Sequence, residues 1–490
     1  MSLLRRFSSL LVAAAFAAPA MFAQTSAPAA GELTVEVAVR RALEKNFDIA
    51  AQRYGPQIAK ESIDIARDAY VPVVTATTSR SGSRTASLGS APSAGTSGST
   101  TKIGVSQQLY TGTSVSVSSQ LARSRIDPAV SALNPAYNAD VTVSVRQQLL
   151  KGMGTEVNEA TIRRARLGLD KANLDYQVVV LNVIQSTENA FHNVIFAREQ
   201  SDVRKFSLAL AQRLFDEART RRDTGVATDL DVLQAEVGVA NARRAVLLAD
   251  QAVKDAEQGL LALIGQFELE SQLGTTHFKE VEDAIPLFAS SYQAAKRAQP
   301  DYLSAQKAVD QAQQDLIVAK DGTKPELSVG GAVGFNGTRS TGGDAYNDAF
   351  NNRSNAWQVD LSLTYPWGQI ADKARYRQTL ATLNQQQSRL RQLEQNIEAQ
   401  VRSAIRAVET NFESVKISAQ ARELSQKQYE LQEAKFKAGL STSYLVLQAQ
   451  NDLENAKVAE LQSKVDLRTS LSALHRIEGS SLQRYAVTLP

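Results

Sequence analysis

The sequence has 490 residues and a net charge of only +3, so nothing in its composition indicates nucleic-acid binding. It contains no cysteine, which excludes thiolate metal sites, disulfide bonds and cysteine nucleophiles. The three histidines lie in separate segments without metal-ligand spacing, and no phosphate-binding loop or nucleophile elbow is present, so we expect neither an enzyme nor a cofactor.

The first 23 residues have the pattern of a Sec-type signal peptide. Arg5 and Arg6 precede an apolar run over residues 10–18, and small residues follow up to Ala23. The run is too short to cross a bilayer, which favours a cleaved signal over a membrane anchor. No later stretch reaches about 18 consecutive apolar residues, so we expect an exported protein that enters a membrane only as a β-barrel.

The mature chain opens with a helical pattern over residues 33–68, which Pro72 ends. From about 72 to 150 the period changes to two, in four runs of roughly 9–11 residues, the length of a tilted outer-membrane strand. Apolar and small polar residues alternate, as in a wall with lipid on one side and water on the other. A soluble β-sandwich has the same alternation; the signal peptide and the long polar connections 79–101 and 337–355 favour the membrane wall.

After Gly154 the period returns to that of a long helix, which reaches a glycine turn at Gly225 and comes back over residues 228–263. Reversing between two helices favours glycine, since the residue after the helix adopts a left-handed conformation. The return arm has heptad-like apolar spacing, which is typical of helices that pack as a coiled coil.

The second half repeats the first. The stretch 224–235 recurs as 438–449, a shift of 439 − 225 = 214, and the region before the strands recurs with a shift of 325 − 72 = 253. We therefore expect two structural repeats, 24–282 and 283–490, the second with two strands at about 325–366 and a hairpin tip near 439. The shifts differ by 39, about one β-hairpin, which leaves four or six strands per subunit open.

The duplicated motifs resemble the TolC-type outer membrane efflux protein family, the outer membrane factors. The motifs are the glycine turns with the runs 230–235 and 241–243, the closing Gly265, and the strand-to-helix junctions 149–152 and 365–368. The resemblance implies an α+β membrane protein: a homotrimer whose subunits close one β-barrel in outer-membrane lipid, continuous with a long periplasmic α-helical coiled-coil barrel. It would lie in the outer membrane of a Gram-negative-type bacterium, with a large periplasmic part.

The function that this resemblance implies is a passive outer membrane channel of a tripartite efflux or type I secretion system. A periplasmic adaptor protein and an inner-membrane pump of the RND or ABC type would be its partners. A non-transporting coiled-coil protein of the cell envelope is the alternative; it explains the helices but neither the alternating strands nor the aligned duplication.

The candidate site is the pair of hairpin tips. The resemblance implies that the turns dock the adaptor, through Thr224, Gly225, Val226, Ala227, Ala438, Gly439, Leu440 and Ser441. Under threefold symmetry Asp229 or Asp231 would form a ring of carboxylates that favours cations at the aperture. An equally supported interpretation is that both acids stabilise the start of a helix. Arg222 stands where the family often has an aromatic residue, and we expect it to pair with an acid as a latch.

Overall fold

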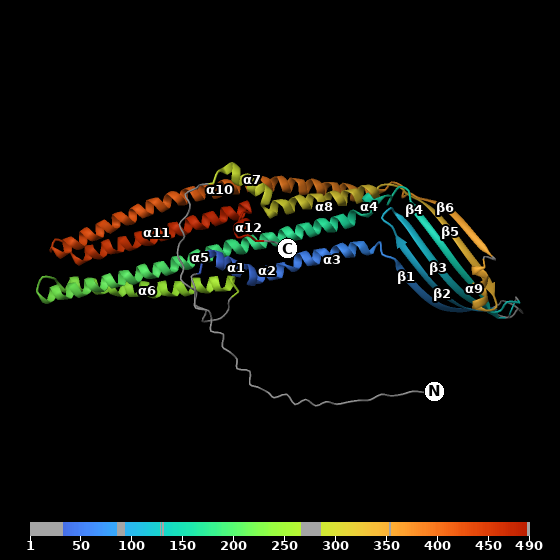
Figure 1. Cartoon of the computed structure of the whole chain (residues 1–490), viewed down its shortest axis with the longest axis horizontal. Helices are drawn as coiled ribbons and strands as arrows, with labels where there is room; N and C mark the ends of the chain where they lie inside the picture. The colour runs from blue at the N-terminus through green and yellow to red at the C-terminus, as the bar shows by residue number, and fades with distance from the viewer. Residues whose placement is uncertain are drawn as a thin grey trace, which may run out of the picture.

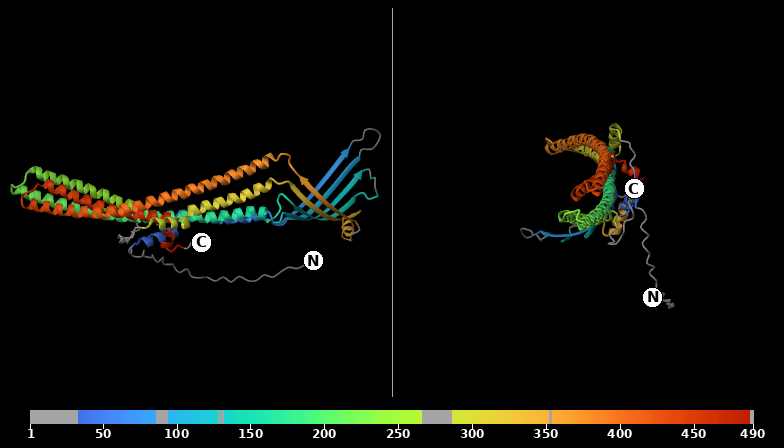
Figure 2. Two further views of the ribbon diagram at one scale, coloured as in Figure 1. Left: turned by 90° about the horizontal axis from the view of Figure 1, so that it is seen from above. Right: turned by 90° about the vertical axis from the view of Figure 1, so that its left-hand side faces the viewer.

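The computed structural model describes residues 33–85, 94–127, 129, 132–265, 286–351 and 354–487. The predicted signal peptide, residues 1–23, lies outside these residues. The molecule is elongated, with long helices at one end and a β-sheet at the other (Figure 1). Seen along its length, the helices form an arc, and the short helices of the middle region lie on the convex side of that arc (Figure 2).

The opening segment forms three helices rather than the single helix expected over 33–68: α1 (Val35–Lys45), α2 (Phe47–Gln52) and α3 (Tyr54–Asp68). Asn46 causes the first break. Its backbone is extended, and its side-chain oxygen accepts hydrogen bonds from the amides of Asp48 and Ile49, at 2.9 and 3.4 Å. An asparagine that caps the next helix in this way ends the previous one.

The second half contains the matching helices α7 (Phe288–Ala298) and α8 (Pro300–Gly322). Their first residues lie 288 − 35 = 253 and 300 − 47 = 253 positions after those of α1 and α2. The helix starts therefore follow the same shift as the aligned sequence.

Six strands form one sheet in the order β1-β2-β3-β4-β5-β6, and each neighbouring pair is antiparallel. The strands are β1 (Val73–Thr85), β2 (Ala94–Gln108), β3 (Thr113–Asp127), β4 (Ala136–Gln148), β5 (Glu326–Arg339) and β6 (Asn355–Thr364). The number that the sequence left open is thus six. Both copies contribute to a single sheet, because β4 of the first pairs with β5 of the second.

One face of this sheet, called the outer face below, is apolar and exposed. A single row of paired residues crosses all six strands: Val74, Val105, Val117, Val143, Val333 and Trp357. All six side chains in the row are exposed, from 42% at Val143 to 77% at Trp357. Because paired residues point to the same side of a sheet, the row defines an apolar band. Helix α9 (Gly342–Phe350) packs on this face, where Tyr346 lies 3.0 Å from Ser119.

The opposite face carries small polar residues. Its rows include Ser106, Ser116, Ser144, Ala332 and Gln358, with the Ser116 and Ser144 hydroxyls 2.6 Å apart. The sheet is therefore two-sided, apolar outside and polar inside, as the alternating sequence predicts.

Beyond the sheet the chain forms two long helical hairpins. The outgoing helices are α5 (Ala160–Asp223, 64 residues) and α10 (Ile370–Lys437, 68 residues), each about 100 Å long at ~1.5 Å per residue. The return helices are α6 (Asp229–Leu263) and α11 (Ser443–Glu478), and the short helices are α4 (Thr155–Asn158) and α12 (Ser481–Arg484). The four long helices lie side by side in the order α10, α11, α5, α6 (Figure 1). Among the described residues, no helix combines the length and the apolar character that a bilayer-spanning helix needs.

The apolar core lies in the middle of the molecule rather than at the hairpin ends. One cluster joins α1 to α5 and α6 through Val39, Ile184, Phe191 and Leu260; a second joins α7 and α8 to α10 and α11. Each return helix is followed by a glycine in the left-handed conformation. Gly265, after α6, contacts the end of α1, and Gly479, after α11, contacts the end of α7. A Cβ on Gly265 would lie 2.6 Å from the Lys45 oxygen, and one on Gly479 would lie 2.8 Å from the Ala298 oxygen.

Candidate functional site at the tips of the two helical hairpins

Both tips use the same turn. Gly225 and Gly439 have φ of +74° and +77°, a conformation that glycine adopts without steric cost. In the first tip the Val226 amide donates to the Arg221 oxygen at 2.8 Å; in the second, the Leu440 amide donates to the Lys435 oxygen at 2.9 Å. These bonds satisfy carbonyls that a helix end otherwise leaves free.

The predicted docking residues form the outermost turns of the two hairpins. Val226 is 75% exposed and Leu440 is 80% exposed, so each tip presents one apolar side chain to solvent. The hydroxyl groups of the docking residues form hydrogen bonds within their own hairpins. The Thr224 hydroxyl donates to the Arg221 oxygen at 3.0 Å, and the Ser441 hydroxyl accepts from the Gln432 amide at 3.1 Å. The turns are thus hydrogen-bonded loops with an exposed apolar apex.

The two acids of the first tip have different surroundings. Asp231 completes a capping box at the start of α6: its carboxylate accepts from the Thr228 amide at 3.0 Å and the Thr228 hydroxyl at 2.7 Å. These hydrogen bonds, helped by one from Ser443, hold the pKa of Asp231 below its ordinary value. Asp229 is different, with a side chain 93% exposed. The hydrogen bonds of a helix start are therefore made by Asp231, whereas Asp229, the first residue of α6, keeps its carboxylate exposed to solvent.

Arg222 pairs within its own hairpin. Its guanidinium lies 2.6 Å from the Asp223 carboxylate and 3.9 Å from that of Asp229. The hydrogen bond to Asp223 is the main reason that the pKa of Arg222 is raised. The acid that Arg222 meets across the turn is thus Asp229, on the same tip.

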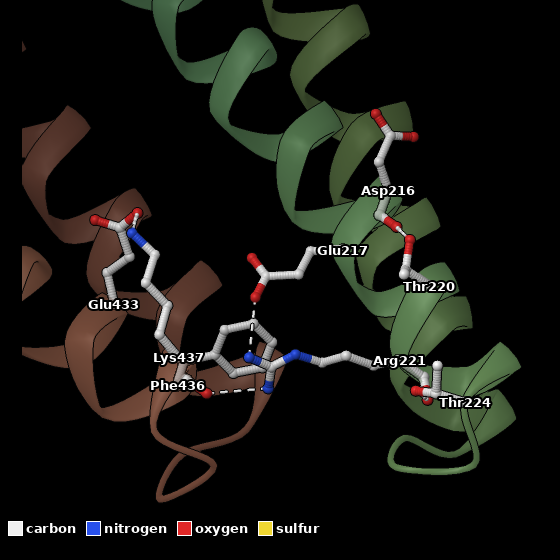
Figure 3. A network of polar contacts seen from close by, with 8 residues as sticks. All are labelled: Asp216, Glu217, Thr220, Arg221, Thr224, Glu433, Phe436 and Lys437. Carbon is white, nitrogen blue, oxygen red and sulfur yellow. Dashed lines mark hydrogen bonds and ion pairs between the residues drawn. The ribbon is translucent and has the colours of Figure 1, made fainter.

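The residue that joins the two hairpins is Arg221, which the sequence analysis did not single out. Its guanidinium carbon lies 4.1 Å from the centre of the Phe436 ring, and one nitrogen donates to the Phe436 main-chain oxygen at 3.0 Å (Figure 3). A second nitrogen donates to Glu217 at 2.9 Å, which fixes the plane of the group. The sequence feature that could have indicated this contact is Phe436, an aromatic residue in an otherwise polar tip, where a neighbouring cation can stack on its ring.

Two further contacts hold the tips together. Ser443, the first residue of α11, donates to Asp231 of α6 at 3.3 Å. Behind the turns a small apolar cluster contains Leu214, Phe436 and Val446, all buried. The Gln450 amide donates to the Ser207 main-chain oxygen at 2.7 Å, so a buried polar contact continues the seam between α5 and α11. The pair of tips therefore behaves as one packed unit.

The sequence matches a protein-family model described as "Outer membrane efflux protein". The match covers residues 131–266 and 291–480, which include both hairpins and the strands β4 to β6. The chain belongs to the outer membrane efflux protein family. This confirms the resemblance recognised in the sequence, the α+β architecture, and the placement in the outer membrane with a large periplasmic part. Members of this family are channel proteins that carry out efflux, not enzymes.

Individual relatives agree with the family match. The chain is 24% identical over 332 residues to the pyoverdine export outer membrane protein OpmQ of Pseudomonas aeruginosa, covering 66% of this chain and 67% of that protein. It is 23% identical over 320 residues to OpmQ of Pseudomonas putida, covering 64% and 65%. Among solved structures, the outer-membrane channel OprN superposes with a TM-score of 0.70 at 18% identity, over 91% of this chain and 89% of that one.

Proposed function

We propose that this efflux channel is the passive exit duct of a tripartite efflux or type I secretion system. The observation that carries the proposal is the continuity of the chain: a sheet with an apolar outer face and a polar inner face leads directly into helices about 100 Å long. A wall of that kind suits a passage that is lined with water inside the bilayer and continues into the periplasm.

The assembly in this proposal is a homotrimer. In the described part of the chain β1 pairs only with β2, and β6 only with β5, so the sheet has two open edges. The helical end also has two open sides. On α6 the exposed apolar residues include Leu233, Val237 and Leu247, and on α10 they include Ile417, Leu424 and Leu431. Joining β6 and α10 of one copy to β1 and α6 of the next pairs the open sheet edges and buries the exposed apolar residues of both helices. Three copies joined in this way close a barrel around one passage.

The adaptor docks on the tips in this proposal. Each tip presents an apolar apex, Val226 or Leu440, on a turn whose own polar groups are hydrogen-bonded. An apolar apex on a hydrogen-bonded turn fits a shallow apolar recess of a partner, since a turn that already holds its own shape loses little ordering entropy on binding. The inner-membrane pump, of the RND or ABC type, supplies the energy.

Asp229 lines the closed aperture in this proposal. Three copies place three exposed carboxylates around the axis, which favours cations at the mouth. Replacing Asp229 with asparagine lowers the preference for cations and weakens block by multivalent cations. The matched control is Asp68→Asn, which removes one exposed carboxylate from the end of α3, away from the tips. Unchanged ion preference in Asp229→Asn and in the Asp229→Asn, Asp231→Asn double variant contradicts a carboxylate gate.

The assembly is tested by membrane fractionation and electrophoresis of the full-length protein. The duct predicts a protein that stays in the outer-membrane fraction, needs detergent for extraction, and migrates as a trimer that heating converts to monomer. A coiled-coil protein without transport function, the rival interpretation, predicts release without detergent. Recovery as a water-soluble monomer contradicts the duct.

A further inference from the structure

The outer face of the sheet carries a row of arginines beyond its apolar band. Arg80 of β1, Arg123 of β3 and Arg339 of β5 lie in one register row, connected by Ser99 of β2 and Tyr137 of β4. On β1 the row is six residues further from the helices than Val74, or about 20 Å at ~3.3 Å per residue.

Only one arginine of this row is neutralised by its own chain. Arg339 forms an ion pair with Asp348 of α9. Arg125 lies two residues beyond Arg123 on β3. In the described part of the chain, no ion pair or hydrogen bond engages the guanidinium groups of Arg80, Arg123 and Arg125. The Nε atom of Arg123 is shielded from solvent and unpartnered. We call Arg80, Arg123 and Arg125 the arginine cluster.

The cluster is specific to one face. At the same level, the inner face carries Ser81 and Ser124, which are neutral. The one acid on the outer face of this part of β3 is Asp127, at the far end of the strand. The cluster therefore leaves an excess of positive charge on the face that carries the apolar band and not on the inner face.

The spacing of the cluster suits phosphate groups. Arg80 and Arg123 lie two strands apart, about 10 Å, and Arg123 and Arg125 lie about 7 Å apart along β3. The planar guanidinium group donates two parallel hydrogen bonds to a phosphate, and it is less strongly hydrated than an ammonium group. The valine row lies on the same face, about 20 Å closer to the helices, and provides a surface for acyl chains.

We infer that the arginine cluster binds the phosphate groups of a phosphorylated glycolipid in the outer leaflet, whose acyl chains lie along the valine row. The inference rests on the outer-membrane placement of the sheet that the proposed function requires. The occupant follows from charge complementarity together with the adjoining apolar surface: a soluble phosphate compound uses the arginines but leaves the valine row without a role. Helix α9 borders the site on the β4–β5 side, where a Cβ on Gly342 would lie 3.1 Å from Leu121.

The test compares the full-length protein with the triple variant Arg80→Gln, Arg123→Gln, Arg125→Gln. Two controls match it: Arg377→Gln, Arg389→Gln, Arg391→Gln removes the same charge from exposed positions of α10, and Lys102→Gln removes one charge from the inner face of the sheet. Each protein is purified in neutral detergent, checked for its oligomeric state, and titrated with a diphosphorylated acylated glycolipid, with the same lipid after phosphate removal, and with inorganic phosphate. Bound lipid is counted by native mass spectrometry.

We expect the triple variant to bind the phosphorylated lipid about tenfold more weakly, since it loses several charge-assisted hydrogen bonds, while both controls bind like the wild type. Phosphate removal weakens binding to the wild type to the same degree. Equal binding by the triple variant, or equal binding of the lipid without phosphate, overturns the inference. Displacement by millimolar inorganic phosphate identifies a free-anion site and also overturns it. Conductance in bilayers of neutral lipid is measured in parallel: channels that conduct normally without lipid binding reject this inference alone, and lipid binding without conductance rejects the duct alone.

Discussion

The guanidinium carbon of Arg221 lies 4.1 Å from the centre of the Phe436 ring, and the same group donates to the Phe436 main-chain oxygen at 3.0 Å (Figure 3). One side chain of α5 therefore binds the last turn of α10. The contact joins two tips that differ in character. The first is charged, with Arg222, Asp223 and Asp229, and the second presents Leu440 and Tyr444. The link therefore holds the two unlike tips of one subunit together.

Replacing Arg221 with alanine releases this link. We expect a tip that opens more often and a mean single-channel conductance above the wild-type value, because the cation–π contact and hydrogen bond together contribute about 1–3 kcal/mol. Lys435→Ala is the matched control, since Lys435 occupies the equivalent position on the second hairpin and is exposed. Equal conductance in both variants and the wild type refutes the link.

We expect Asp231 to act in stability rather than in conduction, because its carboxylate is used in the capping box of α6. Asp231→Ala removes the capping box of α6 and costs about 1 kcal/mol, whereas Asp229→Ala, at an exposed position, leaves the unfolding temperature nearly unchanged. The folded-state pKa of Asp231 lies below its unfolded value of 3.8, so its contribution is complete above that value and is lost as the pH falls through the folded pKa. Thermal unfolding of both variants at neutral and strongly acidic pH checks this, and equal losses in the two would be inconsistent with it.

Gly265 is required by close packing, not only by its backbone angle. Gly265→Ala places a Cβ 2.6 Å from the Lys45 oxygen at φ +68° and is expected to cost about 3 kcal/mol or more. Gly225→Ala has nearly the same angle but no atom within 4 Å, so only the left-handed strain of about 1–2 kcal/mol applies. Unfolding temperatures of the two variants separate these contributions, and an equal effect means that the packing against α1 adds nothing.

The middle region is expected to weaken under mild acid. Burial lowers the pKa of His192 to about 4, with help from Arg468 and Arg484. The unfolded chain takes up a proton near the ordinary value of 6.5 and the folded chain does not, so stability falls as the pH decreases from 6.5 toward 4, by roughly 3 kcal/mol in all. His192→Asn flattens this dependence. The pKa of His475 is also lowered by burial, so His475→Asn shows how much a second histidine contributes. If the loss of stability in acid persists unchanged in the variant that carries both His192→Asn and His475→Asn, other groups cause it.

The long helices and their turns were accessible from sequence because periodicity and glycine are local signals. Gly225 and Gly439 have the same role at a shift of 214, and β3 and β4 alternate over much of their length, so these elements follow from their own residues. The long connections expected over 79–101 and 337–355 were wrong: β1 continues to Thr85, β2 begins at Ala94, and α9 lies in the second connection, because these polar strands lack an apolar alternation that would mark them. The break at Asn46 was missed, although an asparagine three residues before an apolar position is a capping signal.

What sequence reasoning could not reach are contacts between distant segments. The partner of Arg221 lies 215 residues away, and no local pattern indicates which of the neighbouring arginines faces the second hairpin. The two acids of the first tip also look equivalent in sequence. Only the fold shows that Thr228 and Ser443 engage Asp231 and leave Asp229 exposed. The arginine cluster required the strand register, since Arg80 and Arg123 are 43 positions apart and share a face only through β2.

Single-channel recording in a planar bilayer tests the central proposal most directly. The full-length protein, extracted in detergent and added to one side of a neutral bilayer, is predicted to insert and produce discrete, cation-preferring conductance steps that become larger in Arg221→Ala and remain at the wild-type size in Lys435→Ala. A trimer that is correctly assembled but produces no conductance, in the wild type and in Arg221→Ala alike, would contradict the proposal that this protein is an exit duct.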